Sequence, residues 1–228
     1  VIIQLLAKPC GWPRQTTGAL MLIVPIGNTS FMGVPMVNAF FGAAGIPHLI
    51  LYDQIGTMLI FATYGSIILS IYTGESTRIK TIALRALLFP PTTALLAGLL
   101  LRGWPYPQAL TTALESLAGA LTPLVMTAIG YQMTLRLRRT TLSPLSTGLA
   151  IKLLVAPLVA LLGCRLLGFN SLAADIAIFE AGMPPMVTAS ALAAAAGLGV
   201  ELSIALAGLG IILAFASLPL LYTLIQYF

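Results

Sequence analysis

Two apolar stretches of the sequence are interrupted by prolines, and polar residues stand beside both interruptions. The first interruption covers residues 25–35 and the second covers residues 180–185. A proline inside a helix removes a backbone hydrogen bond and clashes with a carbonyl one turn earlier. The resulting half-helix ends offer N–H groups to an anion and carbonyl groups to a cation, so the expected chemistry is the binding of a small charged molecule. The candidate binding residues at the two breaks are Asn28, Thr29, Pro35, Met183, Pro184 and Pro185.

Three of the ionisable residues inside apolar stretches or near their start are candidates for a role in this chemistry. Lys152 either reaches back to the membrane surface along its flexible stem or holds a substrate carboxylate. Glu180 stands one turn before Pro184 and is either a proton carrier or ion ligand, or the acceptor of a hydrogen bond between helices. Asp53 suits a carboxylate at a helix N-terminus, with a role in ion coupling as the alternative. Lys152 and Glu180 are therefore binding-site candidates, and Asp53 is a candidate for coupling.

The elements that position these residues must span a membrane. Of the 228 residues, 59% are hydrophobic and 7% are charged, whereas a soluble domain carries about 25% charged residues. This composition excludes a soluble enzyme, a nucleic-acid-binding protein and a disordered chain. The sequence holds two cysteines and neither a G-x-x-x-x-G-K-[ST] phosphate loop nor an H-E-x-x-H pattern. We therefore expect no catalytic residues, no metal site and no cofactor other than a coupling ion.

Polar residues divide the chain into apolar stretches of the length that a membrane helix needs, which is about 20 residues. Residues 1–7 read as the end of an earlier span. The pattern predicts an all-α membrane protein. The expected spans are residues 17–44, 49–73, 81–101, 107–133, 144–168, 171–197 and 200–227.

The basic residues predict the orientation of these spans. Alternate connections carry most of them, namely Lys8, Arg14, Arg78, Lys80, Arg85, Arg136, Arg138 and Arg139. The intervening connections carry only Arg102 and Arg165. Because basic loops stay in the cytoplasm, the loops near residues 8–15, 74–80 and 134–143 are expected inside and the C-terminus outside.

The two halves of the chain resemble each other. The segment at 35–45 parallels the segment that begins at 185, and 56–63 parallels 210–217. Chance similarity between apolar segments is the alternative explanation. With the predicted orientation, the two copies are inverted, as in many secondary transporters, and their breaks meet near the middle of the membrane. Residues 1–73 then form the C-terminal part of a first repeat and 81–228 a complete second repeat, with further spans expected before Val1.

The first break carries a recognisable motif. Residues 27–35 read GNTSFMGVP and resemble the signature of the auxin efflux carrier family, prokaryotic branch. Residues 180–184 resemble the second crossover of that family, and the segments at 122–124 and 46–53 add weaker similarity. The resemblance implies ten helices in two inverted five-helix repeats with two crossing broken helices, as in the bile-acid sodium symporters. It also implies export or exchange of organic anions.

These observations favour a secondary active transporter of small organic anions or carboxylates that works by alternating access and is linked to protons. The alternatives are a sodium-coupled symporter of the bile-acid type and a non-transporting membrane receptor or scaffold. The expected partners are the organic anion and membrane lipid, but not nucleic acid. The resemblance is compatible with a homodimer and with a bacterial inner or plasma membrane.

Overall fold

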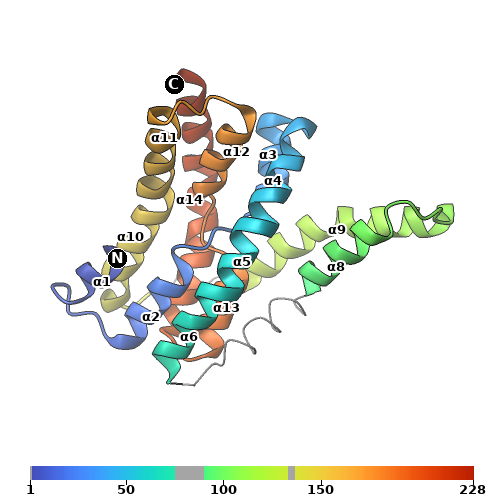
Figure 1. Cartoon of the computed structure of the whole chain (residues 1–228). Coiled ribbons are helices and arrows are strands. Elements are labelled where there is room, and N and C mark those ends of the chain that lie inside the picture. The colour runs from blue at the N-terminus through green and yellow to red at the C-terminus, as the bar shows by residue number, and fades with distance from the viewer. Residues whose placement is uncertain (1, 75–89, 133–136) are drawn as a thin grey trace.

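The chain folds into a bundle of helices (Figure 1). The structure is a computed structural model that describes residues 2–74, 90–132 and 137–228. No β-strand occurs among these residues, which confirms the predicted all-α class. The helices are α1 (Ile2–Ala7), α2 (Arg14–Ile23), α3 (Gly33–Phe41), α4 (Ile46–Leu51), α5 (Met58–Ile60), α6 (Ser66–Thr73), α8 (Pro90–Leu100), α9 (Gln108–Gln132), α10 (Arg139–Ala150), α11 (Ala156–Leu166), α12 (Leu172–Ala181), α13 (Val187–Ala195) and α14 (Val200–Tyr227).

Three continuous helices in the described part of the chain are long and apolar enough to cross a membrane, and they cover Ala43–Thr73, Arg139–Leu166 and Val200–Tyr227. The first joins α4, α5 and α6 through the π-helical turns η2 (Tyr52–Thr57) and η3 (Phe61–Gly65). The second joins α10 and α11 through the π-helical turn η4 (Ile151–Val155). Because π-helical turns are rare and often mark functional sites, their positions are informative.

Two of the expected spans are each broken into two half-helices. The span expected at 17–44 forms α2 and α3, which are separated by residues 24–32. The span expected at 171–197 forms α12 and α13, which are separated by residues 182–186. Both interruptions predicted from the prolines are therefore confirmed, although Pro35 lies inside α3 and outside the first break.

Helices α8 and α9 extend away from the remaining helices (Figure 1). Helix α9 matches the span expected at 107–133, apart from Met133, which lies outside the described residues. The span expected at 81–101 is described only from Pro90 onward, where α8 begins.

The core lies where the broken helices pack against α14. Many of its fully buried residues come from α2, α12 and α14, and these include Leu20, Leu22, Ile23, Ile176, Ile178, Phe179, Leu206 and Leu218. An aromatic cluster closes one end of this core, since Phe41 of α3 packs edge-on against both Phe179 and Tyr222 at 5.1 Å. Burial of these apolar and aromatic side chains therefore fixes the broken helices against a continuous one.

Polar contacts join helix ends beside two of the basic connections. Arg14 at the start of α2 donates to the carbonyl of Ile71 near the end of α6. Arg138 precedes α10 and forms an ion pair with Glu201 in the first turn of α14. The segment before α2 thus lies beside the end of α6, and its residues Trp12 and Pro13 line the same pocket as Arg138 and Glu201. The membrane side that these segments face stays a prediction.

Candidate functional site

The two breaks cross each other and pair through their backbones. The N–H of Asn28 donates to the carbonyl of Pro184 (2.7 Å), and the N–H of Met186 donates to the carbonyl of Ile26 (2.9 Å). Together these bonds form an isolated antiparallel bridge between Gly27 and Pro185. An unpaired backbone N–H or carbonyl group in an apolar environment such as a lipid bilayer costs several kcal/mol. The pairing avoids part of this cost, because each break supplies partners for backbone groups that the other break leaves unpaired. We call this region the crossing.

The residue types at the crossing fit this pairing. Pro184 and Pro185 have no N–H, and the two bonds between the segments use only the N–H groups of Asn28 and Met186. Pro185 in turn packs against Gly210 of α14, where an added Cβ would lie 2.7 Å from the proline Cδ. The prolines thus stand at positions that need no donor, and a glycine provides the space for one of them.

Glu180 points at the beginning of α3. Its side chain is completely buried, and a Cβ added at Gly33, the first residue of α3, would lie 2.7 and 2.9 Å from the two carboxyl oxygens. Neither oxygen has a hydrogen-bond partner among the described residues. A helix N-terminus favours a negative charge. The absence of a side chain at Gly33 therefore leaves space for the carboxyl group at the positive end of the half-helix α3. The alternative prediction, in which Glu180 accepts a hydrogen bond from another helix, is not met among the described residues.

Lys152 occupies the opposite kind of helix end. It lies on the π-helical turn η4, is 5% exposed, and donates from Nζ to the carbonyl of Ala181 (3.1 Å), the last residue of α12. A Cβ added at Gly27 would lie 3.2 Å from Nζ. The ammonium group thus sits at the negative end of a half-helix, where a cation is favoured. The alternative in which Lys152 reaches the membrane surface is wrong.

Asp53 is bound tightly to the first break. Its Oδ1 accepts hydrogen bonds from Thr29 (2.5 Å) and Ser30 (2.7 Å), and its Oδ2 accepts one from Gln54 (2.7 Å). The interpretation of Asp53 as a carboxylate at a helix terminus is wrong, because the continuous helix already begins at Ala43. Pro47 is compatible with this earlier start, because it stands in the first turn of α4, where a proline needs no N–H partner.

Several polar groups at the crossing are buried without a partner. The side-chain amide nitrogen of Asn28 (1% exposed) and the hydroxyl of Ser190 on α13 have none among the described residues. Met183 is completely buried in the second break. The structure therefore brings together all the candidate site residues except Pro35, which lies half-buried in the first turn of α3.

Sequence reasoning missed other residues that the structure adds to the crossing. Ser30 and Gln54 bind Asp53, and Tyr52 lies close enough to Glu180 to interact with it electrostatically. Gly27 and Gly33 belong to the motif, and each provides space for a charged group. The two glycines on either side of Asn28 were a usable signal, because a glycine in a break often marks a close approach.

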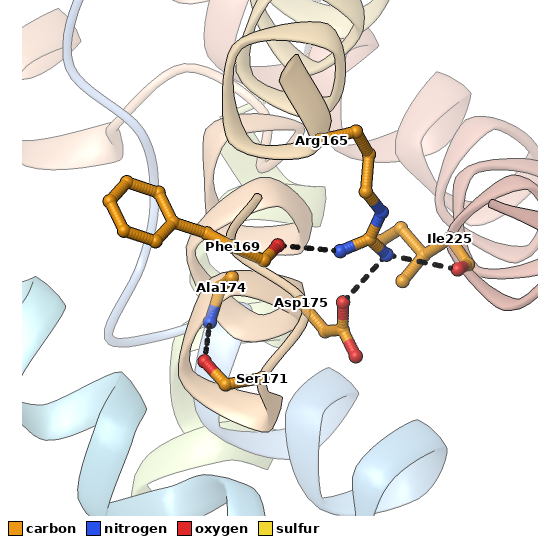
Figure 2. Close-up of polar contacts among 6 residues, drawn as sticks. All are labelled: Arg165, Phe169, Ser171, Ala174, Asp175 and Ile225. Carbon is orange, nitrogen blue, oxygen red and sulfur yellow. Dashed lines mark hydrogen bonds and ion pairs between the residues drawn. The ribbon is translucent and has the colours of Figure 1, made fainter. Parts of the chain in front are cut away.

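A second polar network positions the start of α12 (Figure 2). Arg165, near the end of α11, donates to Asp175 of α12 (2.9 Å) and to the carbonyls of Phe169 (3.0 Å) and Ile225 (3.2 Å). The hydroxyl of Ser171 accepts from the N–H of Ala174, which caps α12. This network joins α11, α12 and α14 at the end of α12 that lies away from the crossing.

The crossing thus combines one cation, two acidic groups and unpaired donors in a buried place. Asn28, Thr29, Asp53, Lys152 and Glu180 are all at most 5% exposed. Within the described ranges, no three His, Cys, Asp or Glu side chains gather in a way that could hold a metal ion. The arrangement is chemically suited to a small charged or polar molecule, since it offers donors, acceptors and helix ends of both signs.

Comparison with known proteins identifies the class of this protein. The family of membrane transport proteins, of the auxin efflux carrier type, matches residues 1–222, and the chain belongs to this family. A relative from Methanothermobacter thermautotrophicus, named an uncharacterized transporter, is 32% identical over 220 residues, which cover 96% of this chain and 72% of the relative. Another uncharacterized transporter, from Methanocaldococcus jannaschii, is 25% identical over 178 residues, or 75% of this chain and 56% of that relative. The protein is thus an integral membrane transporter and not an enzyme.

Proposed function

We propose that this protein is a secondary active transporter of small organic anions such as carboxylates, with the crossing as its binding site. The observation that carries the proposal is that two donors, the side-chain amide of Asn28 and the ammonium group of Lys152, lie together at the two paired helix breaks. The amide nitrogen of Asn28 has no hydrogen-bond partner among the described residues. The first turns of α3 and α13 also begin there, and helix N-termini favour anions.

In this proposal the substrate carboxylate accepts hydrogen bonds from Asn28 Nδ2 and Lys152 Nζ. A lysine has three donors, and only one hydrogen bond of Nζ, to Ala181, is present in the described structure. Thr29, Met183, Pro184 and Pro185 shape the surroundings of the substrate. Pro35 acts indirectly, by setting the first turn of α3.

Transport requires the buried crossing to open to each side of the membrane in turn. An elevator-like or rocking movement of the two pairs of half-helices would do this, and the paired breaks would move together because two backbone hydrogen bonds join them. Residues 1–73 and 81–228 would supply the two inverted repeats. The distribution of basic loops supports a C-terminus outside the membrane. The resemblance to the prokaryotic branch of the family supports a bacterial inner or plasma membrane.

Counterflow of labelled carboxylates in liposomes that contain the full-length protein tests the proposal. Loss of a hydrogen bond to a charged group costs about 1.5–3 kcal/mol, so Asn28→Ala and Lys152→Ala should each raise the substrate KM by at least about tenfold. Asn38→Ala, at an exposed position of α3, and Lys8→Ala, in an exposed turn, are matched controls that should behave as wild type.

Three results would contradict parts of this proposal. If the folded protein shows no counterflow of any carboxylate tested, it does not transport these substrates, and a non-transporting receptor or scaffold is favoured. Flux that depends strictly on sodium would favour the symporter of the bile-acid type. Wild-type KM in both site variants would remove Asn28 and Lys152 from the binding site.

A further inference from the structure

The two buried acids at the crossing have opposite surroundings. Asp53 accepts three hydrogen bonds, from Thr29, Ser30 and Gln54, which favour the charged carboxylate. Glu180 is completely buried, and its carboxyl oxygens accept none from the described residues. An ion in an apolar interior without hydrogen bonds costs several kcal/mol. Three donors thus compensate the carboxylate of Asp53, whereas no donor among the described residues does so for Glu180, which suits a group that gains and loses a proton.

In the described part of the chain, the charged or titratable groups that face Glu180 come from two π-helical turns. Tyr52 and Asp53 face it from the π-helical turn η2, and Lys152 faces it from η4. On α14, Tyr222 belongs to the aromatic cluster with Phe41 and Phe179. The other ionisable residues on α12 and on the elements packed against it lie toward helix ends, namely His48, Cys164, Arg165, Asp175, Glu201 and Tyr227.

The charges of these groups decide when an anion can bind. If Glu180 is ionised, the single positive charge of Lys152 faces two carboxylates, so the crossing is negative before the substrate arrives. If Glu180 is protonated, Lys152 and Asp53 balance each other, and the carboxyl group gains an O–H donor beside the N-terminus of α3. The neutral form therefore removes a repulsion and adds a donor for the substrate.

We propose that Glu180 takes up a proton together with the substrate anion, so that the anion and the proton cross the membrane in the same direction. This inference rests on the proposed function and specifies its coupling. The proton binds a carboxylate oxygen of Glu180 on the side where the anion enters, and it leaves that oxygen on the other side when the anion is released. Transport of a monocarboxylate is then electroneutral, with one proton per anion.

The test uses liposomes that contain the full-length wild type, Glu180→Gln or the control Glu115→Gln. Glutamine has the size of the protonated glutamate and keeps a donor, so Glu180→Gln should still exchange labelled monocarboxylate by counterflow, at a rate that no longer depends on pH. A pH gradient of one unit, acid outside, should drive about tenfold accumulation by the wild type and by the control. Glu180→Gln should show no accumulation. Glu115 is exposed on α9, far along the chain from either break.

Independent measurements keep the proposal open to refutation. A potential set with valinomycin and potassium should leave wild-type accumulation unchanged, and substrate binding in weakly buffered detergent should take up one proton per anion. Three results would each overturn the proton coupling: accumulation by Glu180→Gln, wild-type accumulation driven by a sodium gradient but not by a pH gradient, and substrate binding without proton uptake. In each of these cases, counterflow by the wild type would still support the proposed function. A folded Glu180→Gln protein without counterflow would also overturn the proton coupling. Absence of counterflow in the wild type would refute both.

Discussion

Substitution of Gly33 by alanine tests how closely the first break and Glu180 fit together. The added Cβ would lie 2.7 Å from one carboxyl oxygen of Glu180, 2.9 Å from the other and 3.2 Å from Cδ. Glu180 is completely buried, so its side chain has little room to retreat. Overpacking of this kind typically costs about 1–3 kcal/mol. Alanine regains at most about 0.5–1 kcal/mol of helix propensity, so we expect a net loss of about 1–2 kcal/mol.

Thermal unfolding of the detergent-solubilised protein measures this effect. A loss of 1–2 kcal/mol corresponds to a Tm lower by about 2–8 °C for a protein of this size. Gly56→Ala is the matched control, because its Cβ would meet no atom within 4 Å. Gly56 lies on a π-helical turn of the continuous helix, and its substitution should leave the Tm unchanged or slightly raised.

A double-mutant cycle shows whether the carboxyl group of Glu180 causes the loss. In the Glu180→Ala background the carboxyl group is absent, so Gly33→Ala should cost little. The coupling energy should then recover most of the predicted 1–2 kcal/mol. An equal decrease in Tm from Gly33→Ala in both backgrounds would refute the reasoning, because it would mean that the backbone of the break, and not Glu180, requires a glycine.

Two further substitutions probe the networks around the crossing. Asp53→Asn removes the negative charge to which three donors bind. It should lower the free energy of unfolding by about 2–3 kcal/mol, and the Tm in proportion. An unchanged Tm would show that these hydrogen bonds add nothing to stability. Arg165→Ala breaks a partly buried ion pair and two bonds to carbonyls, so it should cost about 1–3 kcal/mol and speed amide exchange at the start of α12. Arg138→Ala, whose side chain is 85% exposed in its ion pair with Glu201, is the control for Arg165 and should change stability by less than about 1 kcal/mol.

The sequence was sufficient to predict the class of fold and the two breaks. Few charges and long apolar stretches predict membrane helices because a bilayer excludes charged side chains and needs a fixed helix length. Prolines with flanking polar residues, at 25–35 and 180–185, predict broken helices because a proline acts on its own helix. These rules are local, so no knowledge of the partner segments is required.

The details of the site were less predictable because they depend on which segments meet. Asp53 was expected at a helix terminus, but it lies inside a continuous helix and binds Thr29 and Ser30, more than twenty residues away in sequence. The sequence is compatible with two positions for Lys152, and the contact of its Nζ with the carbonyl of Ala181 shows that the ammonium group lies at the crossing. No periodicity within a segment indicates such contacts between segments.

The sequence by itself determined that this is an all-α membrane protein with two proline-broken helices and buried ionisable residues, because composition, span length and proline chemistry act within single segments. Only the tertiary structure decided that the breaks pair with each other, that Asp53 has three donors and that Glu180 has none among the described residues. The physical reason is that hydrogen bonding and charge compensation in a buried site depend on distances between segments far apart in the chain, and packing of the whole bundle sets those distances.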